Sequence, residues 1–272
     1  MATTPSAAVE FQRVSLAFDD NVVLEDLSFE VPRGSMRILL GASGAGKSLV
    51  LKLILGLLKP DSGTILVNAN RVTEMSEDDL LTMRADVGMV FQENALFDSL
   101  TVAENVGFRL YEASDMSLEQ VRARVEEVLN FLGLGEFIDR MPSTLSGGQR
   151  RRVGIARAMA SRPNLMLFDD STTGLDPVIS TSVDDEIVKL RDFQNVTSIV
   201  VSQQIRDAHY IATHRAVRRS DGRLKVIAEQ DGLARFMVLH DGAISFEGTA
   251  AELFASQDPY LQRFLYRTLP PW

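Results

Sequence analysis

The amino-acid sequence predicts an α/β protein that carries a helical segment inserted into its core. A short apolar strand at 36–40 runs through the Gly-rich turn GASGAGKS directly into an apolar helix. A second apolar run, LMLF at 165–168, ends in two adjacent aspartates, as a buried strand does when it presents carboxylates at its C-terminal edge. Between these two, residues from about 94 to 163 carry apolar positions at helical spacing, which predicts a helical subdomain.

The overall composition sets limits on the function. The chain has 272 residues, enough for one large α/β domain with a sizeable core. Its net charge of −9 argues against a protein that coats nucleic acid, although it allows binding of a single nucleotide. With no cysteine, disulfides and thiolate metal sites are excluded. No signal peptide is recognisable, and the most apolar window, SLVLKLILGLLKP, is too short to span a bilayer, so we expect a soluble, cytoplasmic protein.

The elements follow in order along the chain. The alternating stretches VEFQRVSLAF and VLEDLSFEV predict an N-terminal antiparallel β region. The Gly-rich turn then leads into a helix that we expect to end at Pro60, and TILVN forms the next strand. In the helical subdomain, Ser117 and Gln120 are spaced as a capping box, and Gly133 is placed to end that helix.

The last part of the chain returns to alternating helices and strands. We expect a helix at 178–193, a strand TSIVVS, and the strands LKVIA, FMVLH and AISFEG, the last two joined by an Asp241-Gly242 turn. We divide the chain into a domain at 8–250 and a C-terminal helical extension at 251–272. The stretch 215–234 is assigned no chemistry.

The strongest motif is GASGAGKS, which matches G-x-x-x-x-G-K-[ST] between a strand and a helix. Its glycines let successive backbone N–H groups converge on phosphate oxygens at a helix N-terminus. The lysine adds a charge for the phosphates, and the serine offers a hydroxyl to Mg²⁺. The alternative is an unrelated Gly-rich turn, which the strand–turn–helix context disfavours. The predicted nucleotide-binding residues are Gly41, Ala42, Ser43, Gly44, Ala45, Gly46, Lys47 and Ser48.

A phosphate-binding loop needs a second acid to hold its magnesium, and the aspartates after LMLF supply it. Asp169 ends the strand and is the predicted metal ligand. Asp170 points to the other side of the strand and is free to face the γ-phosphate and an attacking water. The alternative for Asp170 is that it only caps the following turn.

The stretch LSGGQRRR at 145–152 suggests a second anion site. Ser146 and Gln149 form a capping box, and the arginines are interpreted as a solvated helix face. That interpretation leaves Gly147 and Gly148 unexplained, because glycine weakens a first helical turn unless something approaches the backbone closely. A phosphate at this helix N-terminus would explain them. Since the chain already has one phosphate loop, we assign this second site to the nucleotide of a partner.

With these motifs in this order, the sequence resembles the ATP-binding subunit of ABC transporters along nearly its whole length. The resemblance adds Gln92 of VFQENALF, which it implies to be a Mg²⁺ ligand and a catalytic residue, and Asp176 of GLDP at the nucleotide site. It also places Phe18 where an aromatic ring stacks on adenine, with a core phenylalanine as the alternative. Within the family, MVFQENALFDSLTVAENV and FEGTAAELFASQDPYLQRFL are most similar to the Mla/Mce-type subunits that energise lipid transport in bacterial envelopes.

The resemblance implies a working assembly as well as a site. ATP and Mg²⁺ are the implied cofactors, bound by a head-to-tail homodimer in which each ATP lies between one chain's GASGAGKS and the other's LSGGQ. Closure of the dimer would drive a separate membrane permease through the region from Gln92 to Val106. The implied location is cytoplasmic, peripheral on the inner face of the cell membrane, without nucleic acid and with further cytoplasmic and substrate-binding subunits of a lipid transporter.

Two positions depart from the family pattern. Asp170 stands where a glutamate usually polarises the lytic water, and Gln203 stands where the switch histidine usually contacts the γ-phosphate. Two readings therefore stay open: an active transporter ATPase, with Asp170, Gln203 and Gln92 as catalytic residues, or a nucleotide-binding module with very slow or no hydrolysis. A third, a soluble ABC protein acting on DNA or ribosomes, is disfavoured because coiled-coil heptads and a basic patch are missing from the sequence.

Overall fold

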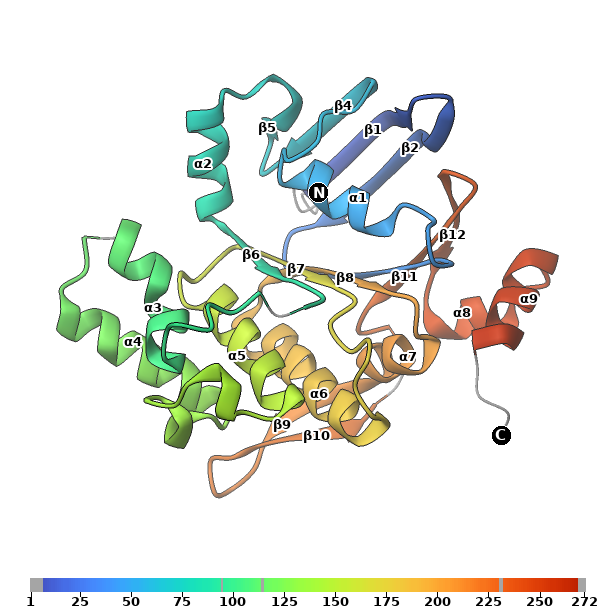
Figure 1. The fold of residues 1–272 in the computed structure, drawn as a ribbon. Helices are drawn as coiled ribbons and strands as arrows, with labels where there is room; N and C mark the ends of the chain where they lie inside the picture. Colours follow the sequence, from blue (N-terminus) through green and yellow to red (C-terminus); the bar gives the residue numbers. More distant parts are fainter. Residues whose placement is uncertain (1–6, 94, 114, 230–231, 269–272) are drawn as a thin grey trace, which may run out of the picture.

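The centre of the fold is a six-stranded sheet with the strand order β12-β11-β3-β8-β7-β6 (Figure 1). The computed structural model describes residues 7–93, 95–113, 115–229 and 232–268. Neighbouring strands from β11 to β6 pair in parallel, and β12 pairs antiparallel with β11. The strands of this sheet are β3 (Met36–Leu40), β6 (Val87–Val90), β7 (Leu165–Asp169), β8 (Thr197–Ser202), β11 (Arg235–His240) and β12 (Ala243–Gly248).

A second, antiparallel sheet forms the predicted N-terminal β region, with the order β2-β1-β4-β5. In β2 the residues Leu24, Leu27, Phe29 and Val31 are all buried, as their spacing predicted. The spacing is interrupted between the first two because Asp26 has a φ of 48°, the left-handed conformation that accompanies a β-bulge. The strands are β1 (Ala7–Phe18), β2 (Asn21–Pro32), β4 (Ser62–Val67) and β5 (Asn70–Arg71).

The parallel strands are mostly apolar because both faces of their sheet are buried. Phe168 of β7 belongs to an apolar cluster shared with helices α3 to α7, whereas its neighbour Leu167 belongs to a second cluster shared with α1 and the antiparallel sheet. Ile38 and Leu39 of β3 divide in the same way. The alternation continues to the end of β7, so the side chain of Asp169 lies on the side of α1.

The helices predicted between Ser117 and Gly133 and at 178–193 are present, as α4 and α6. In α4 the Ser117–Gln120 capping box is present, and Gly133 follows the helix with a φ of 65°. The helices are α1 (Lys47–Ile54), α2 (Glu77–Ala85), α3 (Val102–Ala113), α4 (Leu118–Phe131), α5 (Gly147–Met159), α6 (Pro177–Gln194), α7 (Ile205–Thr213), α8 (Ala250–Ala255) and α9 (Pro259–Thr268), with 3₁₀ turns at Val72–Glu74, Gly135–Phe137 and Pro142–Thr144. The division into a domain at 8–250, a subdomain at 94–163 and an extension at 251–272 stays a prediction.

Helix α1 ends earlier than predicted, at Ile54 instead of Pro60. Gly56 has a φ of 62° and so leaves the helical conformation. Arg84 of α2 then donates from Nε to the carbonyl oxygen of Leu55 at 2.8 Å and from Nη2 to that of Gly56 at 3.2 Å. A side chain on a neighbouring helix therefore satisfies the last carbonyls, which the local sequence did not reveal.

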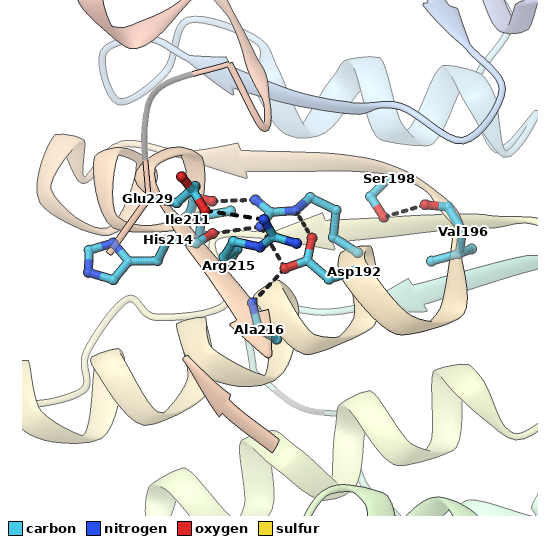
Figure 2. Close-up of polar contacts among 9 residues, drawn as sticks. Asp192, Val196, Ser198, Ile211, His214, Arg215, Ala216 and Glu229 are labelled. Atoms are coloured by element: carbon cyan, nitrogen blue, oxygen red, sulfur yellow. Dashed lines mark hydrogen bonds and ion pairs between the residues drawn. The ribbon is translucent and has the colours of Figure 1, made fainter. Parts of the chain in front are cut away.

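The stretch 215–234 contains a β-hairpin that lies along α6 (Figure 1). Its strands are β9 (His214–Arg218) and β10 (Leu224–Ala228). At its root, Arg191 donates to the carbonyl oxygens of Ile211 and His214, both at 2.6 Å. Figure 2 shows the neighbouring contact, in which Asp192 accepts the N–H of Ala216 at 2.7 Å. The first strand of the hairpin is thus fixed to α6 through its main chain.

The remaining sequence features are also placed by the fold. Asp241 and Gly242 form the predicted hairpin turn between β11 and β12, with φ values of 46° and 77°. His214 stacks on Tyr210 and His240 on Tyr260, whereas His209 meets the ring of Phe254 edge-on, as expected for structural residues. Within the described ranges, none of the helices has the length and apolar character needed to cross a bilayer.

The α6–α7 contact buries a carboxyl group that predicts a pH-dependent stability. Asp184 is 1% exposed and lies near Asp207, which is 2% exposed and paired with Arg206. Desolvation, followed by the charge of Asp207, raises the pKa of Asp184 well above its ordinary value. Because the pKa is higher in the folded than in the unfolded chain, this group destabilises the fold progressively as the pH rises above the unfolded value.

We therefore expect Asp184→Asn to raise the melting temperature at pH 8 by about 3 °C or more, with a gain that shrinks toward pH 4. Thermal unfolding followed by circular dichroism at both pH values measures this difference. Asp98→Asn, a change at an exposed loop position, is the control and should shift neither value. A variant less stable than wild type at pH 8 would show that Asp184 is a stabilised carboxylate instead.

Candidate active site

The phosphate-binding loop occupies residues 41–46, between the C-terminal end of β3 and the start of α1. Gly44 and Gly46 have φ values of 79° and 94°, which favour glycine over residues with a side chain. A Cβ atom on Gly41 would lie 2.7 Å from the carbonyl oxygen of Leu239, so the adjacent strand β11 leaves no room for one. These backbone requirements explain three of the glycines without reference to any ligand. The loop leads directly into the N-terminus of α1.

Lys47 and Ser48 are already ordered by the protein itself. Lys47 is 6% exposed, and its Nζ donates to the carbonyl oxygens of Gly41 and Ala42, both at 2.9 Å. Burial lowers the pKa of Lys47, and the charges of Asp170 and Asp169 oppose that shift. The ammonium group is therefore held at the loop, beside the N-terminus of α1.

Ser48 and Asp169 form a pair suited to Mg²⁺. Ser48 Oγ donates to Asp169 Oδ1 at 2.8 Å, across the gap between α1 and β7. Neighbouring oxygens in an octahedral Mg²⁺ site with bonds of about 2.1 Å are about 3 Å apart, so this spacing already fits two adjacent ligands. The structure thus brings the two predicted metal ligands together, and a hydroxyl and a carboxylate are the donors that Mg²⁺ prefers.

Asp170 is bonded across the sheet edge to the end of β8. Its Oδ1 accepts the main-chain N–H of Gln203 at 3.1 Å, and it is 8% exposed. Burial raises the pKa of Asp170, and the hydrogen bond from Gln203 and the charge of Lys47 oppose the shift. The carbonyl oxygen of Asp170 accepts the N–H of Thr173 at 3.1 Å. The turn is therefore closed by the main chain, while the carboxylate is directed to the neighbouring strand.

The three predicted catalytic residues share one pocket. It has a volume of about 330 Å³ and combines the phosphate loop with the ends of β6, β7 and β8. Its lining consists of Ser43, Gly44, Gly46, Lys47, Ser48, Leu49, Gln92, Asp170 and Gln203. Residues from four separated stretches of the sequence thus converge on one site.

Phe18, predicted to face adenine, lies at the end of β1 and is 45% exposed. The alternative of a core phenylalanine is therefore wrong. The following strand approaches the phosphate loop, because Val23 Cγ1 lies 3.0 Å from the position that a Cβ on Gly46 would take. A contact between Phe18 and adenine stays a prediction.

The LSGGQ segment begins helix α5 as predicted. Ser146 Oγ accepts the N–H of Gln149 at 3.3 Å, and Gln149 Oε1 accepts the N–H of Ser146 at 2.8 Å. A packing constraint explains Gly148, because a Cβ there would lie 2.5 Å from Ile179 Cγ2 of α6. This packing accounts for Gly148 without a ligand, whereas Gly147 meets only Leu175, at the ordinary distance of 3.5 Å, and a contact of either glycine with a partner's nucleotide stays a prediction.

The LSGGQ segment and Asp176 are not among the lining residues described for the phosphate pocket of their own chain. Asp176 caps α6, with Oδ1 accepting the N–H groups of Val178 at 3.0 Å and Ile179 at 3.1 Å. Ser146 is exposed. Neither segment is therefore part of the described lining of its own phosphate pocket, and its role at the nucleotide of a second copy stays a prediction.

Sequence reasoning missed Arg151. The arginines after LSGGQ were expected to form a solvated face, but Arg151 is 4% exposed. Helical spacing contains the signal, since Arg151 lies on the same face of α5 as the buried residues Gly148 and Ile155. It donates to the carbonyl oxygens of Phe91, Gln92 and Thr173.

Comparison with known proteins identifies the class of this fold and site. Residues 24–173 match the ABC transporter family, and this range contains the phosphate loop, the LSGGQ segment and both aspartates. The chain belongs to this family. It is an ATP-binding subunit and an ATPase, with ATP and Mg²⁺ as cofactors.

Individual relatives have different transported substrates in their names. The chloroplastic protein TRIGALACTOSYLDIACYLGLYCEROL 3 of Arabidopsis thaliana is 34% identical over 94% of this chain and 72% of its own length. The intermembrane phospholipid transport system ATP-binding protein MlaF of Haemophilus influenzae is 33% identical over 94% of this chain and 89% of its own. The methionine import ATP-binding protein MetN of Corynebacterium glutamicum is 37% identical over 80% of this chain and 62% of its own.

A solved structure supports the fold and the nucleotide chemistry. A dimeric ATP-binding cassette in a post-hydrolysis state, bound to ADP and Pi, superposes with a TM-score of 0.72 and 29% identity, over 88% of this chain and 97% of that one. The predicted α/β fold with a phosphate-binding loop and an antiparallel β region is confirmed.

The buried position of Lys47 predicts its importance for nucleotide binding. We expect Lys47→Ala to weaken MgATP affinity by on the order of 100-fold or more, because it removes a desolvated cation at the phosphates. Titration of the purified chain with a fluorescent ATP analogue measures the affinity. Lys52→Ala, an exposed change one turn later in α1, is the matched control and should bind normally. Equal affinity of the two variants would contradict the assignment of Lys47.

Proposed function

We propose that the chain hydrolyses ATP slowly to energise lipid transport through a separate membrane permease. The motifs that resemble the Mla/Mce-type subunits support this substrate class, as do two relatives whose names contain a glycerolipid or phospholipid. Relatives that import methionine or Fe³⁺ define the alternatives. The observation that carries the proposed mechanism is the convergence of Lys47, Gln92, Asp170 and Gln203 on one pocket.

The residues of the pocket divide the work of hydrolysis. The N–H groups of the loop and the ammonium of Lys47 bind and orient the β- and γ-phosphates. Ser48, Asp169 and Gln92 would hold Mg²⁺, which neutralises developing charge on the phosphate oxygens. Asp170 uses Oδ1 to accept the N–H of Gln203, so its Oδ2 is the oxygen left to accept a proton from the attacking water. The Gln203 side-chain amide donates to the γ-phosphate.

Two features of these residues predict slow turnover. Asp170 is one methylene shorter than a glutamate, and displacement of a positioning group by about 1 Å lowers a rate by on the order of 10²-fold. Gln203 donates a hydrogen bond but carries no positive charge, so less of the charge that develops in the transition state is stabilised. The hydrogen bond between them limits how far Asp170 is free to adjust, because its carboxylate is tied to the main chain of β8.

The shared site requires two copies of the chain. Because Ser146, Gly147 and Asp176 are outside the described lining of their own phosphate pocket, we propose that each meets the nucleotide bound by a second copy in a head-to-tail dimer. The solved dimer with ADP and Pi supports this arrangement by its similarity. The N-terminus of α5 offers free N–H groups and a positive dipole end to the phosphates.

The permease is proposed to dock beside Gln92. A groove of about 370 Å³ lies between the sheet and the helical subdomain, lined in part by Phe91, Phe97 and Phe108. Their side chains are 41%, 42% and 40% exposed, and the last two rings contact each other at a tilt of 38°, with centroids 4.7 Å apart. We propose that an apolar segment of the permease covers these rings. Because the permease is a membrane protein, this contact would hold the chain at the inner face of the cell membrane.

The hydrolysis mechanism predicts a gain of function. In the permease complex, we expect Asp170→Glu and Gln203→His together to raise kcat and leave KM for ATP nearly unchanged. The reason is that the added interactions form only in the transition state and so do not change binding of ATP in the ground state. Asp170→Asn should lower kcat by on the order of 10²-fold. Steady-state ATPase assays of wild type, both single variants and the double variant measure these effects. Unchanged kcat in Asp170→Asn would refute its role as the catalytic base.

The substrate class has its own test. The complex of this chain with its permease, reconstituted in liposomes that contain a fluorescent phospholipid, should move that lipid between membranes in the presence of MgATP. A complex carrying Lys47→Ala is the control and should not. The same complex is offered methionine and Fe³⁺. If methionine or Fe³⁺ stimulates ATP hydrolysis and no lipid moves, the proposal of lipid transport is wrong and import of that solute takes its place.

A further inference from the structure

Arg151 is a buried cation that contacts main-chain oxygens instead of an acid. Its Nη1 donates to the carbonyl oxygen of Phe91 at 3.0 Å and to that of Gln92, and its Nη2 donates to that of Thr173 at 3.4 Å. Burial lowers its pKa, and no carboxylate of the described residues contributes to the shift. A desolvated guanidinium without a counter-charge costs free energy unless hydrogen bonds compensate it. Three carbonyl oxygens provide that compensation here.

These three carbonyl oxygens belong to the two segments that carry the catalytic side chains. Phe91 and Gln92 follow directly after β6, and Gln92 lines the phosphate pocket. Thr173 belongs to the turn after β7, and its N–H donates to the carbonyl oxygen of Asp170 at 3.1 Å. One guanidinium therefore joins the main chains next to Gln92 and Asp170, although these residues are 78 positions apart in the sequence.

Helix α5 holds the segment after β6 at a second point. Arg157, six residues after Arg151, donates from Nη1 to the carbonyl oxygen of Ala95 at 2.6 Å. Both contacts start from the helix that begins at Ser146. Because a helix moves largely as a unit, a shift of Ser146 at its N-terminus would also shift Arg151 and, through its hydrogen bond, the main chain of Gln92.

We propose that Arg151 is a positioning residue that fixes the main chain of Gln92, so that the amide of Gln92 reaches Mg²⁺ when the start of α5 engages phosphate. This inference rests on the proposed function of the pocket. Arg151 touches neither nucleotide nor metal in this mechanism. Its effect passes through Gln92, and it links the LSGGQ segment, which serves the nucleotide of one site, to the metal ligand of the other.

The test compares Arg151→Met with Arg124→Met in the purified full chain. Arg124 of α4 is the matched control, since it also donates two hydrogen bonds to carbonyl oxygens of the α5 end, those of Ala160 at 3.0 Å and Met159 at 2.9 Å. We expect Arg151→Met to lower kcat by on the order of 10²-fold, to raise the Mg²⁺ concentration for half-maximal rate, and to leave KM for ATP nearly unchanged. Arg124→Met should keep kcat and the Mg²⁺ requirement of wild type.

A double variant distinguishes positioning from an independent effect. If Arg151 acts through Gln92, the variant with both Gln92→Ala and Arg151→Met should be no slower than Gln92→Ala alone. Arg151→Lys keeps the charge but not the planar fork, so it should be intermediate in kcat. It also provides the measurement if Arg151→Met fails to fold, which circular dichroism reports.

Two results would overturn the inference. The first is a kcat for Arg151→Met or Arg151→Lys within about 2-fold of that for Arg124→Met. The second is a kcat of the double variant that is lowered by the product of the fold-losses of Gln92→Ala and Arg151→Met. Failure of the proposed function looks different, because Lys47→Ala would then hydrolyse ATP as fast as wild type. If Lys47→Ala loses ATPase activity but the Arg151 variants keep it, the inference about Arg151 is wrong while the proposed function stands.

Discussion

The parallel pairing of β3, β8 and β7 is the constraint on which the site depends. Because the three strands run in the same direction, their carboxyl ends meet at one edge of the sheet. The phosphate loop leaves β3, Gln203 follows β8, and Asp169 and Asp170 end and follow β7. Backbone hydrogen bonding in the core thus fixes the mutual positions of the residues that we propose to act on the nucleotide. Their side chains need only short hydrogen bonds to complete the arrangement.

The period-two alternation of β7 separates the two aspartates into two roles. Asp169 lies on the face of α1 and accepts the hydroxyl of Ser48. Asp170 has a φ of 43° and leaves the strand conformation, and its carboxylate accepts the main-chain N–H after β8. This difference in environment leaves the Asp169 carboxylate beside Ser48, as proposed for a metal ligand, while burial raises the pKa of Asp170. The strained backbone at Asp170 is found at the residue that faces the attacking water in the proposed mechanism.

Helix α5 links the parts of the site that different chains are proposed to share. The side chains of Ser146 and Gln149 cap its N-terminus. Its second residue, Gly148, packs against α6, and its buried face carries Arg151. A cation buried among carbonyl oxygens costs free energy that no nearby acid offsets, so it favours a well-defined geometry over maximal stability. The same helix therefore connects the LSGGQ segment, the end of β6 and the turn after β7 as one rigid unit.

The sequence by itself determined the fold class, the phosphate loop and the helix caps, because these depend on residues close together in the chain. Turns that need glycine, strands buried on both faces and the Ser146–Gln149 capping box all leave local patterns. The sequence did not determine the end of α1, the need for Gly148 or the burial of Arg151. Arg84, Ile179 and the carbonyl oxygens of Phe91 and Gln92 cause these features, and each lies more than 25 residues away. Contacts between such distant segments are decided by how helices pack on the sheet, which only the tertiary structure specifies.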